Sequence, residues 1–256
     1  MSLTRTVLRV AAPLPRLENF QRYLFVGPHP DDIEIGAGAT AACLAAEGKD
    51  VCFLICIDGR YGSENAPDLS ADALIQLRKE EALASAKMLG VQDVRFLGLC
   101  DGGFYDMQEL LYGIAQTLSD FQPQVVFAPD PCVNSECHID HRNVGDAARR
   151  LAYFARYKDI MARYGANAAP VQALAFYMTA KPNFFVKTTG FLSRQFDAVF
   201  QCHRSQFPGD SSEGKAIRLY LKLRSMDYGL RCLAKSAEGF RVLGTVHMHC
   251  LPEAGI

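Results

Sequence analysis

Short apolar runs and longer mixed stretches alternate along the first part of the chain. Each run is apolar on both of its faces, which fits a parallel strand covered by helices on either side. The runs predict strands at 23–26, 51–57, 94–97 and 125–128. The mixed stretches between them predict helices at 35–47, 71–89 and 107–118. Gly48 and Gly90 suit the C-cap positions of the first two helices.

This alternation of strand and helix predicts an α/β fold with a Rossmann-like, doubly wound, mostly parallel sheet flanked by helices. The C-terminal part is less regular and predicts an α+β arrangement. Its expected elements are a long helix at 142–163, strands at 174–178 and 183–186, and mostly helical segments at 191–206 and 212–238.

The sequence has no repeat and no clear linker, so we expect a single domain over residues 1–256. Within it, we expect an N-terminal arm at 1–22 and a Rossmann-like core at 23–160. Residues 161–256 are expected to complete the rim around a substrate.

Composition narrows the class of protein. The 256 residues are 49% hydrophobic and 21% charged, which is typical of a globular chain with one full core. A formal net charge of −1 gives no reason to expect a nucleic-acid partner. No apolar run approaches the ~18 residues of a membrane span, and Arg5, Arg9 and Pro13 interrupt any leader-like core. The nine cysteines include no CxxC pair, so we expect reduced cysteines and a cytoplasmic protein.

Polar residues gather in the loops that follow the predicted strands. Open α/β sheets bind ligands outside the carboxyl ends of their strands. That rule places four loops on one rim of the molecule. They are residues 28–32, 58–63, 99–103 and 129–141.

In two of these loops, two side chains of metal-ligand type stand three residues apart, His29 and Asp32 in one loop and His138 and His141 in the other. The first contains His29-Pro30-Asp31-Asp32 and the second contains His138-Ile139-Asp140-His141. Imidazole and carboxylate suit Zn²⁺, and catalytic zinc commonly has three protein ligands and one open position. Two histidines and one aspartate would meet that need, with Fe²⁺ or Co²⁺ as other ions that fit. The second aspartate of the first loop would then stand beside the metal as a base.

Other interpretations of these residues are open. The histidines could be surface residues and the paired aspartates a helix N-cap. Alternatively, Cys132 and Cys137 could join the second loop's histidines in a closed structural zinc site. Such a site would leave the first loop unexplained.

Gly36-Ala37-Gly38-Ala39-Thr40 invites comparison with a dinucleotide-binding loop. The pattern G-x-G-x-x-G would need a glycine at position 41, where the chain has Ala41. The carboxylates just before the glycines would also repel a phosphate. We therefore expect these glycines to allow close packing of the first helix on the sheet.

The chain resembles the PIG-L/LmbE-like N-acetylglucosaminyl de-N-acetylases, which are zinc enzymes that remove acetyl groups from N-acetylglucosamine-type sugars. The resemblance runs from about residue 23 to residue 242. The matching segments are GPHPDDIEIGAGAT, IDGRYGS, RKEEALASAKMLGV, FLGLCDGGF, HIDHRNVG, HRSQF and EGFRV. The two metal motifs in this order are its most specific part.

The resemblance implies a role for each site residue. His29, Asp32 and His141 would hold zinc, and Asp31 would be the general base. His138 would stabilise the tetrahedral oxyanion and help the amine to leave, and Asp140 would hold His138 in its working tautomer. Arg78 and Asp101 match positions that hold sugar hydroxyls. The chain departs from the family at Pro28, where most members have Ala, at Ala39, where Gly is often found, and at Glu136, where some members have Tyr.

The leading hypothesis is a zinc-dependent hydrolase that removes an acetyl group from an N-acetylglucosamine-type sugar or glycoconjugate. The alternatives are an amidase acting on a thiol conjugate at the same metal site, and a non-enzymatic Rossmann nucleotide-binding module. We expect an amino-sugar substrate, no nucleic acid, no membrane span and a possible homo-oligomer. His203, His247 and His249 receive no assigned role, and we expect them to be core, rim or surface residues.

Overall fold

The computed structural model describes residue 7, residues 10–209, residues 211–249 and residue 251. In this part of the chain, seven strands form one sheet in the order β3-β2-β1-β4-β5-β7-β6. The five strands from β3 to β5 are parallel, β7 is antiparallel to β5, and β6 is antiparallel to β7. The strands are β1 (Arg22–Gly27), β2 (Asp50–Ile57), β3 (Asp93–Leu99), β4 (Val125–Pro129), β5 (Ala173–Tyr177), β6 (Phe184–Lys187) and β7 (Ala237–Gly244).

Helices follow most of the parallel strands. The longer ones are α2 (Asp32–Ala46), α3 (Ala71–Leu89), α4 (Met107–Phe121), α5 (Ile139–Phe154) and α8 (Ser212–Arg231). The shorter ones are η1 (Leu17–Asn19), α6 (Lys158–Met161), η2 (Ala162–Tyr164), α7 (Leu192–Asp197) and the π-helical turn η3 (Ala198–Cys202).

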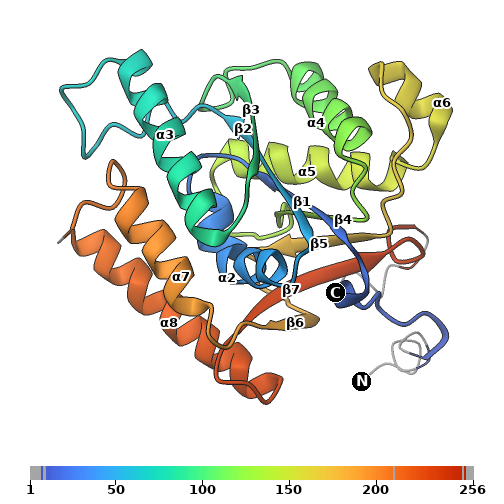
Figure 1. The fold of residues 1–256 in the computed structure, drawn as a ribbon. Coiled ribbons are helices and arrows are strands. Elements are labelled where there is room, and N and C mark those ends of the chain that lie inside the picture. The colour runs from blue at the N-terminus through green and yellow to red at the C-terminus, as the bar shows by residue number, and fades with distance from the viewer. Residues whose placement is uncertain (1–6, 8–9, 210, 250, 252–256) are drawn as a thin grey trace.

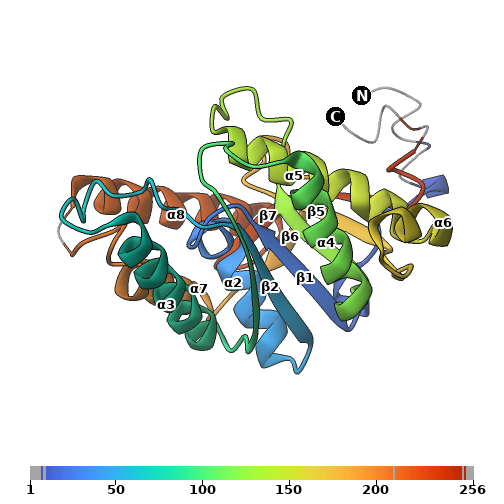
Figure 2. The ribbon, with the colours of Figure 1, turned by 90° about the horizontal axis from the view of Figure 1, so that it is seen from above.

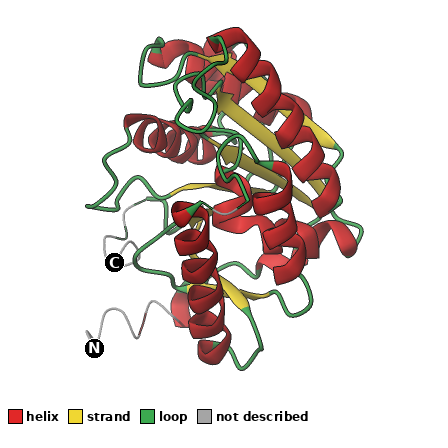
Figure 3. Cartoon of the chain, turned by 90° about the vertical axis from the view of Figure 1, so that its left-hand side faces the viewer, coloured by secondary structure: helices red, strands yellow, loops and turns green. Residues whose placement is uncertain are grey.

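The helices form a layer on each face of the sheet (Figure 1). In Figure 2, α4, α5 and α6 lie on one side of the strands, and α2, α3, α7 and α8 lie on the other. Figure 3 shows the strands and the helices packed around them from the left-hand side of Figure 1. Alternate residues of β1 enter the two cores, since Leu24 and Val26 pack with α4 and α5 while Tyr23 and Phe25 pack with α2 and α3. The predicted fold class is therefore confirmed.

The structure differs from the sequence-based expectation in the C-terminal part. The predicted helix 142–163 is two helices, because α5 ends at Phe154 and the carbonyl of Ala155 accepts a hydrogen bond from the amide of Ala169. The predicted helical segment 212–238 also ends earlier, at Arg231. The residues after it form β7, which lies between β5 and β6 in the sheet.

Close contact between α2 and β5 fixes the start of α2 over the sheet. A Cβ on Gly36 would lie 2.2 Å from the ring of Tyr177, so only glycine allows this approach. The Tyr177 hydroxyl donates a hydrogen bond of 2.8 Å to the carbonyl of Val26 on β1. Gly38 is a second close approach, in which a Cβ would lie 3.1 Å from Gln195 of α7. The glycines thus pack the helix against its neighbours, as expected.

Across the described residues, none of the helices combines the length and the apolar character that a membrane crossing requires.

Candidate metal centre

The loop between β1 and α2 brings three polar side chains to the carboxyl end of the central strand. Asp32 is the first residue of α2, and its Oδ2 accepts a 2.9 Å hydrogen bond from the amide of His29. The same oxygen lies 3.2 Å from Nδ1 of His29. Asp31 has a left-handed backbone with φ 118°, which is strained for any residue other than glycine. The turn therefore directs neighbouring carboxylates to different surroundings.

The first turn of α5 brings His141 to the same point. Its Nε2 lies 3.3 Å from Oδ2 of Asp32. One donor atom from each of His29, Asp32 and His141 lies within 4.8 Å of the other two. Metal bonds of about 2.0–2.2 Å at tetrahedral angles place donor atoms about 3.4 Å apart. The observed spacings of 3.2 and 3.3 Å therefore fit one small divalent cation.

The other nitrogen of each histidine faces a carboxylate. Nε2 of His29 lies 3.1 Å from Asp101 and 3.3 Å from Asp140. Nδ1 of His141 lies 3.0 Å from Oε2 of Glu136. A carboxylate behind a metal-binding histidine fixes its tautomer and makes the facing nitrogen a better ligand. Each imidazole therefore has one nitrogen held by carboxylate and the other directed at Asp32.

Electrostatics at the site favour positive charge. Burial alone would lower the pKa of His29 and of His141, but their carboxylate neighbours hold the pKa of His29 well above its usual value. The same balance raises the pKa of His141 to about 9, through Asp32 and Glu136. Although burial opposes it, His141 also holds the pKa of Asp32 well below its usual range. Such a concentration of carboxylates suits a cation at the centre.

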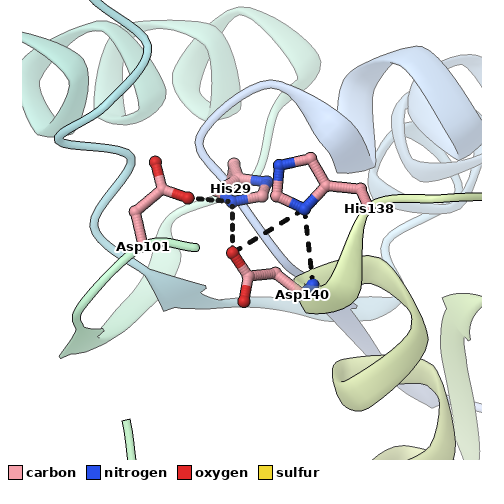
Figure 4. Close-up of side chains that lie close together, drawn as sticks. All are labelled: His29, Asp101, His138 and Asp140. Carbon is pink, nitrogen blue, oxygen red and sulfur yellow. Dashed lines mark hydrogen bonds and ion pairs between the residues drawn. The ribbon is translucent and has the colours of Figure 1, made fainter. Parts of the chain in front are cut away.

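A second group of donor atoms shares His29 and contains Asp101, His138 and Asp140 (Figure 4). Asp140 is fully buried, and its two oxygens accept 2.8 and 2.9 Å hydrogen bonds from the amides of Gly102 and Gly103. Nδ1 of His138 accepts a hydrogen bond from the amide of Asp140. The possible metal-binding atoms of Asp140 and His138 are thus already hydrogen-bonded within the protein. We therefore interpret this second group as one that orients His29, and not as a separate metal site.

Asp140 contacts His138 less closely than it contacts His29. Oδ2 of Asp140 lies 3.7 Å from Nδ1 of His138. The backbone amide of Asp140 donates a 3.3 Å hydrogen bond to the same nitrogen. Because Nδ1 accepts this hydrogen bond, the proton of the neutral His138 ring is on Nε2. Burial and the two neighbouring histidines lower the pKa of His138. The side chain is 45% exposed, so it presents a neutral N–H at the mouth of the site.

Arg78 contacts the Asp31 carboxylate. Within the described part of the chain, Arg78 is the one residue that hydrogen-bonds this carboxylate, through Oδ2 at 3.2 Å. Burial raises the pKa of Asp31 to about 6, although Arg78 lowers it. Arg78 also donates to the carbonyls of Gly59 and Pro30 and is only 4% exposed. Arg78 is therefore buried, and both of its terminal nitrogens are hydrogen-bonded to groups of the protein itself.

Asp101, the other residue expected to hold sugar hydroxyls, has partners within the protein. Its Oδ1 faces His29, and its Oδ2 accepts a 3.2 Å hydrogen bond from the amide of Tyr61. The side chain is buried.

The remaining candidates from the sequence lie elsewhere. His203 is fully buried, and its Nε2 lies 3.1 Å from Glu34 of α2, which also accepts a hydrogen bond from Ser85. Nε2 of His247 lies 2.9 Å from the carbonyl of Ala12, and the ring of His249 stacks on Tyr153. Among the described residues, the possible metal clusters contain no cysteine, so a closed cysteine–histidine zinc site is not formed.

Glu136 is the site residue that sequence reasoning did not place. The sequence showed only that Glu136 stands at a position where some members of the family it resembles have a tyrosine. Glu136 also accepts a 2.8 Å hydrogen bond from the amide of His138, so it joins the two histidines of one loop. A carboxylate two residues before one histidine and five before the other was the available signal.

Comparison with known proteins gives consistent matches. The family model described as GlcNAc-PI de-N-acetylase, PIG-L, matches residues 24–152, which include both metal motifs. The diacetylchitobiose deacetylase of Thermococcus kodakarensis is 32% identical over 241 residues, covering 92% of this chain and 88% of that protein. A 1D-myo-inositol 2-acetamido-2-deoxy-alpha-D-glucopyranoside deacetylase of Kineococcus radiotolerans is 31% identical over 201 residues, covering 67% of this chain and 55% of that protein.

The fold also matches a solved structure along nearly its whole length. The N,N'-diacetylchitobiose deacetylase from Pyrococcus horikoshii, solved with its inhibitor MPG, superposes with a TM-score of 0.85 at 30% identity. The match covers 97% of this chain and 94% of that chain.

Proposed function

Because this chain belongs to the GlcNAc-PI de-N-acetylase (PIG-L) family, we propose that it is a divalent-metal-dependent hydrolase that removes the acetyl group from an N-acetylglucosamine-type sugar or glycoconjugate. One observation carries the proposal for this chain. Donor atoms of His29, Asp32 and His141, which come from two loops more than a hundred residues apart, lie within 4.8 Å of one another. Asp31, with its raised pKa, lies beside them.

We propose His29 through Nδ1, Asp32 through Oδ2 and His141 through Nε2 as the ligands of the cation. Two imidazoles and one carboxylate suit Zn²⁺, and they also accept Fe²⁺ or Co²⁺. The bound cation supplies a Lewis acid that acidifies water and polarises the acetamide carbonyl. Glu136, Asp101 and Asp140 keep the two imidazoles in the tautomers that this ligand set needs.

Asp31 is the proposed general base. Its Oδ2 is held by Arg78, which leaves Oδ1 to accept a proton from the attacking water. A carboxyl whose pKa is raised to about 6 can take up this proton and return it to the departing nitrogen. Water and the amide are thereby converted to acetate and an amine, with the proton passed through one side chain. Arg78 acts here as a positioning residue.

His138 is the proposed oxyanion donor. Its Nδ1 accepts a hydrogen bond from the Asp140 amide, so the N–H on Nε2 is free to donate to the substrate's carbonyl oxygen. Negative charge develops on that oxygen during the reaction. A neutral donor agrees with the lowered pKa of this histidine. A preorganised donor of this kind contributes about 10²–10³ in rate. When the bond between the carbonyl carbon and the nitrogen then breaks, the departing nitrogen takes up the proton held by Asp31.

Two exposed aromatic residues stand at the rim and are proposed to contact the sugar. Tyr61 and Phe104 pack edge to face with ring centroids 6.3 Å apart. The backbone amide of Tyr61 donates a hydrogen bond to Asp101, which places Tyr61 next to the site. Apolar ring faces commonly cover the apolar face of a bound ligand while polar groups fix its orientation.

Metal analysis combined with a substrate panel tests this proposal. Purified protein should contain about one divalent cation per chain and should release amine from N-acetylglucosamine, diacetylchitobiose or an N-acetylglucosaminyl inositol. Chelation should abolish the release, and adding back Zn²⁺, Fe²⁺ or Co²⁺ separately should identify the ion that restores it best. Hydrolysis of a thiol-conjugate amide in place of all three sugars would favour the amidase. Protein without metal that is stabilised by nucleotide would overturn the enzyme assignment.

A further inference from the structure

Helix α2 is interrupted shortly after it begins. Ala37 has φ −152° and ψ 17°, which lie outside the α-helical range. The break divides the helix into a first segment, residues 32–36, and a second segment, residues 38–46. The first segment carries Asp32, the proposed metal ligand, and the second is buried in the core at Ala41. The angle between the two segments therefore sets where Asp32 lies relative to the core.

The carboxylate of Glu238, on β7, holds the start of the second segment. It accepts a 3.2 Å hydrogen bond from the amide of Ala39 and a 2.7 Å hydrogen bond from the amide of Thr40. The first amides of a helical segment have no carbonyl partner one turn earlier, and a side-chain oxygen commonly satisfies them. Here that oxygen comes from a residue 198 positions after Thr40. Tertiary structure, and not the local sequence, therefore caps the second segment.

The side chain of Gln195, on α7, holds the end of the first segment. Its Nε2 donates hydrogen bonds to the carbonyls of Glu34, over 2.8 Å, and Ile35, over 3.4 Å. The same nitrogen donates a 2.9 Å hydrogen bond to Oε1 of Glu238. A Cβ on Gly38 would lie 3.1 Å from Gln195, so glycine at this position gives the side chain room. The two side chains thus form one buried bridge across the break in α2.

The first segment connects this bridge to the site. Asp31, the proposed base, stands directly before the segment with a left-handed backbone. Its carbonyl accepts a 3.0 Å hydrogen bond from the amide of Ile35, whose own carbonyl accepts from Gln195. A strained backbone persists only where the surrounding structure holds it. The contacts of Gln195 therefore bear on the conformation of Asp31 and, through the same segment, on Asp32.

We propose that Glu238 and Gln195 are positioning residues, which act together across the break in α2 to fix Asp32 as a metal ligand and Asp31 as the base. The proposal rests on the function proposed above. Among the described residues, the possible metal clusters include neither side chain. The effect of Glu238 and Gln195 on the metal must therefore pass through α2.

A second anchor of the first segment is the main alternative. The carboxylate of Glu34 accepts a hydrogen bond from Ser85 of α3 and lies 3.1 Å from Nε2 of His203. If these contacts alone fixed the segment, Glu238 and Gln195 would contribute only to the stability of the fold. The two explanations differ in a measurable quantity, because a loss of stability does not change the metal affinity of molecules that are folded.

The metal affinity of the folded protein tests the proposal. Glu238→Gln keeps the shape of the side chain but leaves one acceptor oxygen for two amides. The comparison is made at pH 8, where wild-type Glu238 is ionised because burial raises its pKa only to about 7. Competition against a chromogenic chelator should show a dissociation constant for Zn²⁺ that is roughly tenfold higher. With saturating metal, kcat should fall roughly ten- to a hundredfold and KM should change little.

A matched control separates positioning from stability. Asn183 also holds β7, since its side chain donates a 3.0 Å hydrogen bond to the carbonyl of Val242 and accepts a 2.7 Å hydrogen bond from the amide of Val242. Asn183→Ala should lower the free energy of unfolding but leave the Zn²⁺ affinity and kcat at the wild-type values. Urea denaturation would check that every variant is folded under the conditions of the assay.

A double-variant cycle tests whether the two side chains act as one bridge. Gln195→Ala should by itself raise the dissociation constant for Zn²⁺ roughly three- to tenfold. Because either loss opens the same bridge, Glu238→Gln/Gln195→Ala should raise it little more than the larger single effect. Effects that multiply would show that the residues act independently and that the proposed bridge is wrong. If Glu238→Gln does not fold, Gln195→Ala alone decides the role in metal binding.

The remaining outcomes also decide the matter. Wild-type Zn²⁺ affinity and kcat in folded Glu238→Gln and Gln195→Ala would overturn the proposal and leave Glu34 as the anchor of the first segment. A wild-type protein that binds no metal would overturn both this proposal and the proposed function. A wild-type protein that binds metal and releases amine keeps the proposed function, whatever these variants show.

Discussion

Glu136 and His141 form a carboxylate–histidine pair at the candidate metal centre, with Oε2 of the glutamate 3.0 Å from Nδ1 of the imidazole. Both residues belong to the segment after β4, five positions apart. The pair leaves Nε2 of His141 directed at Asp32, 3.3 Å away. The orientation of a proposed metal ligand thus depends on a residue that contributes no ligand atom.

Replacing Glu136 should weaken metal binding. The variant Glu136→Gln keeps the shape but loses the negative charge that supports His141, and we expect a 10- to 100-fold loss of affinity, roughly as found for other carboxylates behind metal-binding histidines. Competition against a chromogenic chelator would measure the affinity. Glu109→Gln, on the exposed side of α4, is the matched control and should behave as wild type. An unchanged affinity in Glu136→Gln would show that the pair is not needed for metal binding.

The proposed base should be separable from the metal site. Asp31→Asn keeps the side-chain size and one oxygen that can accept from Arg78, but it removes the group that takes the proton. We expect kcat to fall by about 10²–10⁴ while the metal content stays at the wild-type level. Amine release under saturating substrate and metal analysis of the same sample would measure both. Turnover near the wild-type rate would assign the proton transfer to another residue.

The aromatic rim should act on substrate binding. Phe104 is 73% exposed and packs on Tyr61, so Phe104→Ala removes an apolar surface without opening the core. We expect a rise in KM of roughly tenfold, equal to about 1.4 kcal/mol of lost contact, with kcat changed much less. Steady-state kinetics on diacetylchitobiose would separate the two. Tyr112→Ala, an exposed aromatic residue on α4, should leave KM unchanged.

The sequence predicted the core of the fold because local patterns there agree with tertiary structure. Runs apolar on both faces did form parallel strands, and the rule for strand ends placed the two histidine motifs on one rim. The C-terminal part was harder to predict. No glycine or proline marks the break after Phe154, and β7 is a strand because it fills the space between β5 and β6. Such long-range pairing leaves little trace in a local pattern.

Side-chain partners in the site were equally difficult to predict. The spacing of histidine and aspartate indicated which residues could share a metal. It did not indicate which nitrogen of His29 faces Asp32. It also did not indicate that Asp140 would accept hydrogen bonds from the backbone amides of Gly102 and Gly103. These contacts join loops after three different strands. They depend on the sheet order, which the sequence does not specify residue by residue.

Close packing of α2 should make Gly36 intolerant of a side chain. The added Cβ of Gly36→Ala would lie 2.2 Å from the Tyr177 ring and force the helix or the ring to move. We expect a loss of about 1–3 kcal/mol in the free energy of unfolding, as is usual for overpacked cores. Urea denaturation followed by circular dichroism would measure it. Gly209→Ala is the control, since nothing lies within 4 Å of the position that its added methyl group would take, and a similar loss there would refute the packing explanation.

Glu238 should give the folded protein a distinct dependence on pH. Its carboxylate is buried and accepts hydrogen bonds from the amides of Ala39 and Thr40 and from Gln195. Burial raises its pKa to about 7, although these hydrogen bonds and the charge of Arg224 lower it. In the unfolded chain a glutamate titrates near about 4.3.

Between those two pKa values the folded state therefore binds more protons than the unfolded state. The contribution of Glu238 to the free energy of unfolding must then fall as pH rises from about 4.5 to about 7, and above that window the loss is complete. The variant Glu238→Gln is neutral at every pH and lacks this term. Its stability relative to wild type should increase by on the order of 2–3 kcal/mol across the window.

Urea denaturation of both proteins at matched pH values would measure this difference, in which the titration of all other groups cancels to first order. Cys43 and Arg224 are the titratable groups that interact with Glu238 from α2 and α8. Cys43 stays uncharged between pH 4.5 and 7, because burial raises the pKa of its thiol to about 11. A difference that stays constant with pH, or that shrinks as pH rises, would show that Glu238 is ionised in the folded protein throughout.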